Sequence, residues 1–460
     1  MKLPIIVPLC FAVAATACTE WTEPIGDRDQ QYVQVVDVPP TFNRKLDLLF
    51  VVDNSSTMSS KQQQLLMSFR KLTAHLEHMR GGLPNFHIGV VSTDVGVGPN
   101  SVATCSLTGD AGDLQAAPRL PGCGAPDDQF IMDDGFNTNH DGTLHQAFSC
   151  IAPLGTRGCQ FEQPLESMQL ALDGYNANNT GFLRDDAALG VVFLTDEDDC
   201  SAKNTQLFSQ NLMGEPLSKF RCFDYGVKCD GDDVRREGDY SNCTPDEDSE
   251  LMPRVSDYAN FLVDLKGGDD SQVVVTGIFG QADLVNVAGI DEHSYEVQPA
   301  CGDVAGDDAA YPAVRLQGFL NQLPKGGKVG NLCGNDGFDV LSTMSKQLRK
   351  TLGITCLDGN VRDTDPDRAG IQPTCRVYDI TPASGRKNIP ECSVQHAPWL
   401  SDEFPCYRII TGPESCGDFP GQQLALSVCR GPNATGDWCL EDSQPLYTHT
   451  IAECLLQKQP

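Results

Sequence analysis

The sequence predicts an α/β protein built on a doubly wound, mostly parallel sheet with helices on both faces. Three short apolar runs, at 46–52, 188–194 and 272–279, have the length and composition of buried strands. Segments whose apolar residues recur at helical spacing alternate with these runs, which is typical of a doubly wound sheet. Two of the runs end in an acid, Asp53 and Asp196, at the edge where such sheets bind ligands.

The other elements follow in order along the chain. Met58, Leu65, Phe69, Leu72 and Leu76 mark one face of a helix that follows the first strand, and Gly81-Gly82 ends it. The remaining elements expected in this region are a strand at 86–93, a helical face at 161–172, a helix at 255–265, a helix near 313–323, a last strand at 328–333 and a last helix at 337–352.

Residues 1–17 have the pattern of a secretory signal: one lysine, a short apolar core and small residues before Cys18. The apolar run is too short to span a bilayer. Because the Ala-Thr-Ala-Cys ending resembles a bacterial lipoprotein processing site, we expect Cys18 to carry lipid and residues 18–44 to form a lipid-anchored linker. The protein would then reside in the outer membrane or at the surface of a Gram-negative cell, attached through lipid only. Ordinary cleavage would instead give a periplasmic or secreted protein.

Composition shifts divide the rest of the chain. The alternating strands and helices occupy 45–353, with insertions near 94–149, 197–250 and 281–312 that are rich in Gly, Asp or Cys. From 354 to 460 the chain has eight cysteines, many Pro and Gly, and short alternating runs. This pattern predicts a small, disulfide-rich module that is mainly β.

Cysteine usage agrees with export. Of 20 cysteines, Cys10 lies in the signal and Cys18 is the expected lipid site, which leaves an even number without the spacing of a zinc site. Disulfides in an oxidising compartment are the simplest interpretation. Because short loops close most easily, the sequence predicts three bridges: Cys105–Cys123, Cys150–Cys159 and Cys229–Cys243.

The formal net charge of −30 makes nucleic acid an unsuitable partner. Most of the acids are expected to solubilise the surface, and the functional alternative for some of them is the binding of divalent cations.

The first strand ends in a run of hard oxygen donors, Asp53-x-Ser55-x-Thr57. This run resembles the metal-ion-dependent adhesion site of von Willebrand factor A domains, whose signature is Asp-x-Ser-x-Ser. The resemblance covers roughly 45–353 and extends to myxobacterial-type lipoproteins of that family, in which the string at 195–200, Thr-Asp-Glu-Asp-Asp-Cys, is familiar.

The resemblance implies the other ligands. The acid that ends the fourth strand would be Asp196, and the threonine of the second loop would be Thr156, which precedes a periodic helix. Thr138 and Thr143 are weaker candidates, because no helix is expected to start directly after them.

The resemblance also implies how such a site would bind a partner, through a metal ion. Mg²⁺ prefers about six oxygen ligands, and Ca²⁺ or Mn²⁺ are alternatives. Ser55, Thr57 and, in some members of the family, the residue equivalent to Thr156 would bind directly, whereas Asp53 and Asp196 would act largely through water. The ion would stay electrophilic and bind a carboxylate of a protein partner. The string 197–199, Glu-Asp-Asp, replaces a glycine that is common in the family, and these acids could occupy the open position or repel an acidic ligand.

The function predicted is therefore a non-enzymatic, metal-dependent binding or adhesion protein of the cell envelope. One alternative is a structural envelope protein, stiffened by disulfides, with an idle metal site. A secreted hydrolase is the other, although the sequence has no HExxH or Gly-x-Ser-x-Gly motif.

Overall fold

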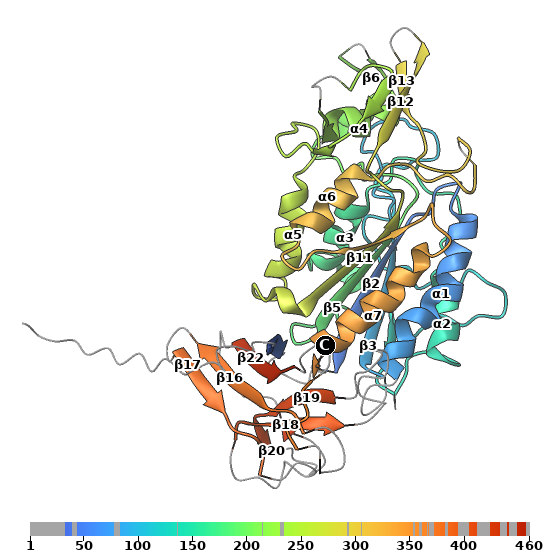
Figure 1. Cartoon of the computed structure of the whole chain (residues 1–460). Helices are drawn as coiled ribbons and strands as arrows, with labels where there is room; N and C mark the ends of the chain where they lie inside the picture. Colours follow the sequence, from blue (N-terminus) through green and yellow to red (C-terminus); the bar gives the residue numbers. More distant parts are fainter. Residues whose placement is uncertain are drawn as a thin grey trace, which may run out of the picture.

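The structure, a computed structural model, describes residues 33–38, 44–77, 83–135, 137–213, 215–230, 234–291, 294–304, 306–352, 355–357, 361–365, 367, 372–381, 385–393, 404–411, 424–432, 439–440 and 449–456 (Figure 1). Residues 1–17, the expected signal segment, and Cys18 lie outside the described residues, so the expectations about the signal and lipidation stay predictions.

The main body of the chain is α/β and surrounds a six-stranded, mostly parallel sheet of order β14-β11-β5-β2-β3-β4. Its strands are β2 (Lys45–Val52), β3 (Asn85–Ser92), β4 (Ile131–Asp133), β5 (Ala188–Leu194), β11 (Val273–Phe279) and β14 (Lys328–Asn331). Neighbouring strands are parallel except β3 and β4. The predicted mixed α/β class and mostly parallel sheet are confirmed.

Strand β2 shows why the sheet is buried on both sides. Successive side chains of a strand point to opposite faces. Leu48 and Phe50 pack into one apolar cluster, whereas Leu49 and Val51 pack into another. A strand buried on both faces reads as a nearly continuous apolar run. The buried polar residue within the strand, Asp47, accepts a 2.8 Å hydrogen bond from the Arg184 guanidinium.

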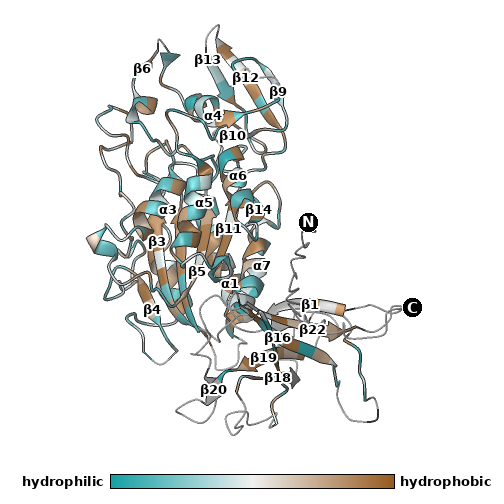
Figure 2. Cartoon of the chain, turned by 90° about the vertical axis from the view of Figure 1, so that its left-hand side faces the viewer, coloured by the Kyte–Doolittle hydropathy of each residue, from teal (hydrophilic) through white to brown (hydrophobic). Residues whose placement is uncertain are grey.

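Helices cover both faces, and Figure 2 shows the hydrophobic strands enclosed between them. The first cluster includes residues of α1 (Ser59–Glu77), α2 (Leu144–Ile151) and α7 (Val340–Thr351). The second includes residues of α3 (Pro164–Leu172), α5 (Val255–Asp264) and α6 (Val314–Gln322). The helices predicted after the first strand and at 161–172, 255–265, 313–323 and 337–352 are therefore present, and each differs from the prediction by a few residues at its ends.

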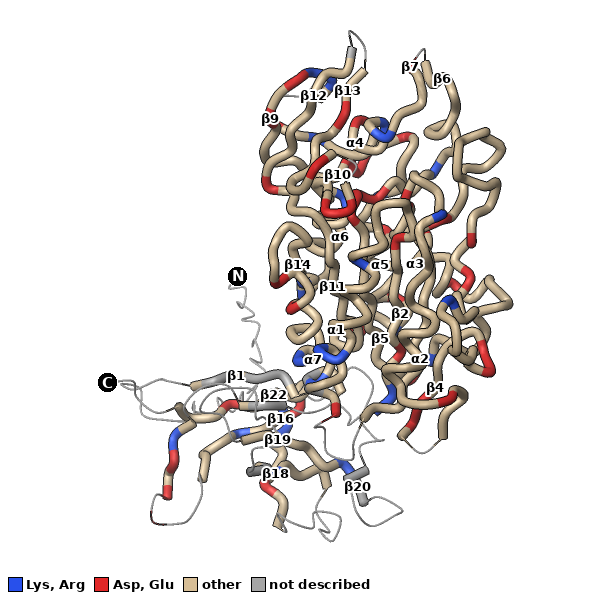
Figure 3. Tube along the Cα trace, turned by 90° about the vertical axis from the view of Figure 1, so that its right-hand side faces the viewer, with Lys and Arg blue, Asp and Glu red and all other residues tan. Residues whose placement is uncertain are grey.

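Two insertions follow the carboxyl ends of β5 and β11. The first contains β6 (Asn211–Leu212), β7 (Glu215–Pro216), α4 (Phe220–Gly226), β8 (Val227–Lys228), β9 (Gly238–Tyr240) and β10 (Thr244–Pro245). The second contains β12 (Val285–Asp291) and β13 (Ser294–Val297). Strand β9 pairs with β12, so the insertions join in a small sheet of order β13-β12-β9. Figure 3 shows several acidic residues over these elements.

The described residues from 355 onward form short strands. They are β15 (Thr355–Cys356), β16 (Cys375–Thr381), β17 (Gly385–Ile389), β18 (Cys406–Thr411), β19 (Leu424–Cys429), β20 (Gly431–Pro432), β21 (Cys439–Leu440) and β22 (His449–Leu455). They lie at the end of the molecule opposite the insertions (Figure 1). Because α7 runs back from the carboxyl end of β14, this C-terminal region meets the amino edge of the main sheet.

Part of the expected linker is structured. Residues Val33–Val38 form β1, an edge strand that pairs antiparallel with β22 in a sheet of order β1-β22-β16-β17. The assignment of all of 18–44 to a linker was therefore wrong. Val33, Val35 and Val38 indicate strand propensity, but the partner strand lies more than 400 residues away along the chain, so local sequence could not reveal the pairing.

Two of the three predicted disulfide pairs were wrong. Cys229–Cys243 is confirmed, but Cys105 pairs with Cys159 and Cys123 with Cys150. The other bridges among the described residues are Cys200–Cys222, Cys301–Cys333, Cys375–Cys454 and Cys392–Cys406. Burial explains the two errors. Cys105 and Cys159 share an apolar cluster with Phe161, whereas Cys123 and Cys150 pack in the cluster of the α2 face.

Disulfides of this number indicate an oxidising, exported environment. Within the described part of the chain, no helix combines the length and hydropathy needed to cross a bilayer.

Candidate functional site

Asp53 lies where β2 and β5 end side by side. Val52 is paired with Leu194, and the Asp53 N–H donates to the Leu194 carbonyl at 2.9 Å. The Asp53 side chain is fully buried; its Oδ1 accepts the Ser55 N–H at 2.7 Å and its Oδ2 accepts the Thr195 hydroxyl at 2.9 Å. Donors on both oxygens fix the orientation of this carboxylate.

Asp196, at the end of β5, contacts a lysine that the sequence analysis did not consider. The Lys61 ammonium donates to Asp196 Oδ2 at 2.7 Å, and both side chains are almost completely buried. Lys61 comes from the first turn of α1 and also donates to the carbonyl of Thr57 at 3.0 Å. The predicted ligand segments 53–57 and 196 are therefore linked through one buried cation.

The loop that carries Thr156 is held against the same edge. The Gln62 side chain donates to the carbonyls of both Asp53 and Gly155, and the Gly158 N–H donates to the Asn54 carbonyl at 2.8 Å. A Cβ at position 158 would lie 1.9 Å from Asn54 Oδ1, so glycine is required for this close approach. Thr156, which is half-buried, is thus positioned by its loop neighbours.

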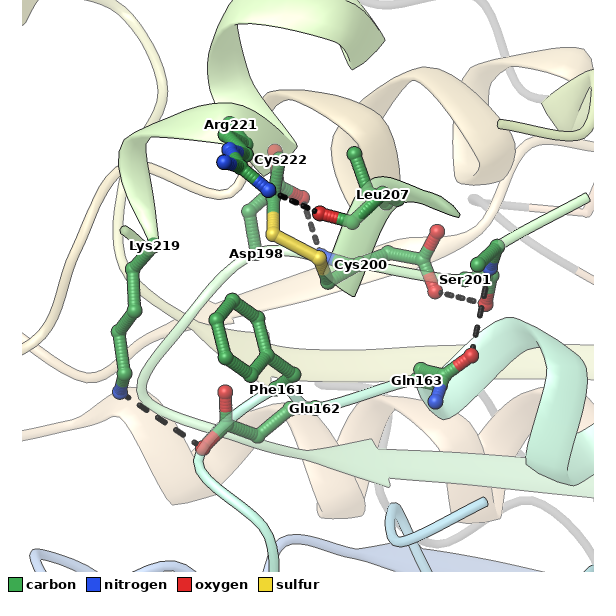
Figure 4. The surroundings of a disulfide bond; sticks show 12 residues. Phe161, Glu162, Gln163, Asp198, Cys200, Ser201, Leu207, Lys219, Arg221 and Cys222 are labelled. Carbon is green, nitrogen blue, oxygen red and sulfur yellow. Dashed lines mark hydrogen bonds and ion pairs between the residues drawn. A yellow bond between two sulfur atoms is a disulfide. The ribbon is translucent and has the colours of Figure 1, made fainter. Parts of the chain in front are cut away.

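Two further acids approach Asp53 and Asp196, from the segment before α3 and from the loop after β5. Glu162 is almost completely buried, and Glu197 is largely covered. Lys219, the residue before α4, forms ion pairs with both of them (Figure 4 shows its approach to Glu162). Four carboxylates at this edge are therefore accompanied by two ammonium groups, those of Lys61 and Lys219.

The pKa shifts follow from this crowding. Burial raises the pKa of Asp53 to about 7, and repulsion from Asp196 and Glu197 adds to the shift. Burial, with repulsion from Glu197, also holds the pKa of Glu162 well above its usual range. Burial alone would lower the pKa of Lys219, but attraction to Glu162 and Glu197 raises it instead.

Several buried oxygens at this edge have no hydrogen-bond partner among the described residues. They include Asn54 Oδ1, Ser55 Oγ, Asp196 Oδ1 and Glu162 Oε1, the last of which lies 3.9 Å from the Lys219 ammonium. Buried polar atoms are nearly always satisfied, so such a group of oxygens calls for an explanation. Hydroxyl and carboxylate oxygens are the ligands that Mg²⁺, Mn²⁺ and Ca²⁺ prefer. The residues present therefore fit a divalent cation.

The acids that follow Glu197 are used elsewhere. Asp198 accepts the N–H groups of Arg315 and Leu316 at the start of α6, with distances of 2.9–3.1 Å. Asp199 accepts the Arg315 guanidinium at 3.1 Å and the Leu165 N–H at 3.1 Å. Of the acids at 197–199, Glu197 is the one whose repulsion raises the pKa of Asp53 appreciably.

The structure thus brings the loops of all five predicted ligands, Asp53, Ser55, Thr57, Thr156 and Asp196, to one edge of the sheet. The reason for preferring Thr156 over Thr143 was partly wrong, because α2 does begin directly after Thr143. Thr143 is exposed, however, and its hydroxyl caps that helix by accepting the Gln146 N–H at 3.2 Å.

Sequence reasoning missed three residues that shape the site. Lys61 lies four positions after Thr57, which is about one helical turn. The expected helix therefore already placed Lys61 on the helix face nearest the motif at 53–57. Thr195 directly precedes the strand-end acid, and Glu162 lies in the first turn of the expected helical face at 161–172. Neither Thr195 nor Glu162 has a local sequence signal of burial.

Comparisons with known proteins give weak likenesses. No protein-family model and no curated protein matches the chain. Among solved structures, the chain is similar to proximal thread matrix protein 1 of the mussel byssus (12% identity, TM-score 0.29, 71% of this chain and 52% of that chain). It is also similar to the pilus adhesin SpaC from Lactobacillus rhamnosus GG (10%, 0.32, 94% and 44%) and to a von Willebrand factor type A protein from Catenulispora acidiphila (9%, 0.27, 94% and 68%). The chain spans about half the length of the first two, and TM-scores this low support no functional argument.

Proposed function

We propose that this chain is an exported envelope protein whose von Willebrand factor A-type sheet carries a divalent-cation site that binds a carboxylate of a protein partner. The observation that carries the proposal is the pair of unpartnered buried oxygens, Ser55 Oγ and Asp196 Oδ1, beside the fully buried Asp53. These oxygens have no hydrogen-bond partner among the described residues, and a cation bound at this edge would provide one.

Charge supports a divalent ion. Asp53, Asp196, Glu162 and Glu197 carry up to four negative charges, and Lys61 and Lys219 balance two of them. Uncompensated buried charge is costly, so either protons or one divalent cation would complete the balance. The hydroxyls of Ser55, Thr57 and Thr156 would hold the ion directly, whereas Asp53 and Asp196 would act largely through water.

The bound ion would supply Lewis acidity toward a carboxylate ligand. Few of the direct ligands are anionic, so the ion would keep its attraction for a partner's Asp or Glu. The chain's own residues orient the donors: Thr195 and Ser55 fix the Asp53 carboxylate, and Gln62 holds the Thr156 loop. This arrangement suits reversible binding.

The fold would present the site away from an anchor. Strand β1, the first described segment after Cys18, belongs to the C-terminal sheet at the amino edge of the main sheet, whereas Asp53 lies at the carboxyl edge. Lipid on Cys18 would therefore hold the C-terminal region toward the membrane. Metabolic labelling with a fatty-acid probe tests the lipid on Cys18, and equal labelling of wild type and Cys18→Ala would reject the anchor.

Thermal unfolding tests the metal site. Millimolar Mg²⁺, Mn²⁺ or Ca²⁺ should raise the melting temperature, because a ligand that binds only the folded state stabilises it. Asp53→Ala should abolish this response and still fold, since apolar side chains of β2 build the core. Asp186→Ala, which removes an exposed acid from the opposite edge, is the matched control and should respond like wild type. A wild-type melting temperature that ignores all three metals and EDTA would end the proposal.

A partner would be sought by capturing envelope or host proteins on the immobilised chain with Mg²⁺ and with EDTA. Capture that needs the metal and is lost in Asp53→Ala supports the binding function. The alternative of a structural protein with an idle site is favoured by one observation, the Lys61 ammonium already paired with Asp196. It predicts no metal response in either experiment.

A further inference from the structure

Lys61 has an unusual environment for a lysine, with only 4% of its surface exposed. Its ammonium donates to Asp196 Oδ2 at 2.7 Å, to the Thr57 carbonyl at 3.0 Å and to the Asp307 carbonyl at 2.9 Å. An ammonium has three donors, so these three bonds use its full capacity. The three acceptors belong to three different loops.

The third of these loops, of which residues 301–304 and 306–310 are described, contacts the edge of the proposed metal site through Asp307 and Lys61. The Cys301–Cys333 disulfide and an isolated bridge between Cys301 and Ala310 close its base. Next to that base, the Tyr311 N–H donates to the Asp196 carbonyl at 2.7 Å. Toward its tip, Asp307 is exposed, and its carbonyl accepts both Lys61 and the Ser60 hydroxyl.

Asp196 connects this loop with the cation site. Its Oδ2 is held by Lys61, whereas its Oδ1 is buried without a hydrogen-bond partner among the described residues. A divalent cation near Oδ1 would share one carboxylate with the Lys61 ammonium in a buried, weakly screened place, where like charges repel strongly. The ion and the ammonium therefore compete for Asp196.

We propose that Lys61 is a tethered cation that competes with the metal for Asp196, and that metal loading therefore loosens the 301–310 loop. The inference rests on the proposed metal site. Lys61 is a positioning residue here: it acts on the loop through Asp307 and on the metal through Asp196. The loop carries three exposed acids, Asp303, Asp307 and Asp308, which would repel a partner's carboxylate. Loosening it would expose the metal-loaded site to such a partner.

Hydrogen exchange of the full chain, followed by mass spectrometry in MgCl₂ and in EDTA, tests the coupling. Amides of 306–310 should exchange severalfold faster in MgCl₂, while amides of 53–58 should exchange more slowly. A loop whose exchange is unchanged or slower, in a protein whose melting temperature rises with Mg²⁺, would overturn the coupling and leave the metal site standing. No response of either measurement would overturn both.

Variants separate competition from general loosening. Lys61→Met keeps much of the stem and removes the charge, so Mg²⁺ should raise the melting temperature at a lower concentration than in wild type, and the loop should exchange fast with or without metal. Lys71→Met is the matched control, because Lys71 is an exposed lysine of the same helix that pairs with Asp339. Equal Mg²⁺ midpoints in the two variants would overturn the competition. If Lys61→Met does not fold, the wild-type exchange experiment decides alone.

Discussion

The Thr195 hydroxyl lies 2.9 Å from Asp53 Oδ2 and donates a hydrogen bond that joins the end of β5 to the end of β2. The same hydroxyl accepts the Glu197 N–H at 3.2 Å, so it also orders the start of the loop that follows Asp196. Two strand ends that are neighbours in the sheet are thereby fixed by one side chain.

Thr195→Val should weaken both the fold and the metal response. Valine keeps the shape but leaves a buried carboxylate oxygen without its donor, which costs about 1–3 kcal/mol of unfolding free energy. Asp53 would also lose its fixed orientation, so more Mg²⁺ should be needed to raise the melting temperature. Chemical denaturation and metal titration measure the two effects.

Thr276→Val is a matched control for that variant. Thr276 is buried on β11, and its hydroxyl has no hydrogen-bond partner among the described residues. Its replacement should leave stability equal or higher and the metal midpoint unchanged. A metal midpoint that moved equally in both variants would show that Thr195 has no specific role.

Asp198→Asn and Asp199→Asn should differ, although the residues are adjacent. The amide oxygen of asparagine can still accept the N–H groups at the start of α6, and burial already raises the pKa of Asp198 to about 7, so we expect a loss of about 1 kcal/mol. Asp199→Asn leaves the fully buried Arg315 without its carboxylate and should cost about 3–5 kcal/mol.

The metal response distinguishes the role of these acids from that of ligands. Asp198→Asn should keep the wild-type metal midpoint, because Asp198 faces α6. A lost response in that variant, with stability nearly unchanged, would instead make Asp198 part of the cation site. Urea denaturation with and without MgCl₂ measures both quantities.

The central strands of the main sheet could be predicted from local sequence alone. The runs at 46–52 and 188–194 could be recognised because strands buried on both faces must be apolar at nearly every position. The location of Asp53 and Asp196 at one edge of the sheet follows from these two strands, because parallel strands place their carboxyl ends at the same edge. The positions of these two acids were therefore predictable before any contact was known.

Long-range pairings were not predictable in the same way. The shortest-loop argument counts only the entropy of closure, which changes slowly with loop length. Cys105 reaches Cys159 because the two sit in one apolar cluster, and that cluster exists only in the folded chain. Lys61 is a comparable case: its helix was predicted, but its contact with Asp307 depends on a loop almost 250 residues away.

Without metal, the protein should become less stable as pH rises from about 4 to about 7. The folded-state pKa of Asp53 is about 7, above its usual value, so between the two values the folded state holds a proton that the unfolded chain has released. Protonation therefore favours folding, and raising the pH through this window removes that contribution. Glu162 shifts in the same direction.

Metal should reverse this trend, because a cation neutralises the carboxylates that protons neutralise at lower pH. The rise in melting temperature caused by Mg²⁺ should be larger near pH 8 than near pH 5. Melting curves in EDTA and in MgCl₂ across this range measure the effect, with Asp53→Asn as the variant in which the pH dependence should flatten. An Mg²⁺ effect of the same size at both pH values would contradict a site that contains Asp53.

The Cys105–Cys159 bridge should support the site as well as the fold. It anchors the segment 155–162, which carries Thr156 and Glu162, and the Cys159 N–H also donates to Asp94 at 3.1 Å. Replacing both cysteines by Ala should cost about 4 kcal/mol for a loop of this length. The freed segment should hold Thr156 less well, so the Mg²⁺ midpoint should rise.

The double replacement of Cys229 and Cys243 by Ala is the control for this prediction, because it removes a disulfide that lies away from the proposed site. That bridge closes a short loop next to the paired strands β8 and β10, within an insertion, and its loss should cost about 3 kcal/mol. The metal midpoint should stay at the wild-type value, because neither cysteine contacts the segment of Thr156. Urea denaturation and Mg²⁺ titration give an unfolding free energy and a Mg²⁺ midpoint for each of the two double variants. A metal midpoint that followed stability alone, shifting in proportion in both variants, would show that the Cys105–Cys159 bridge has no part in positioning the site.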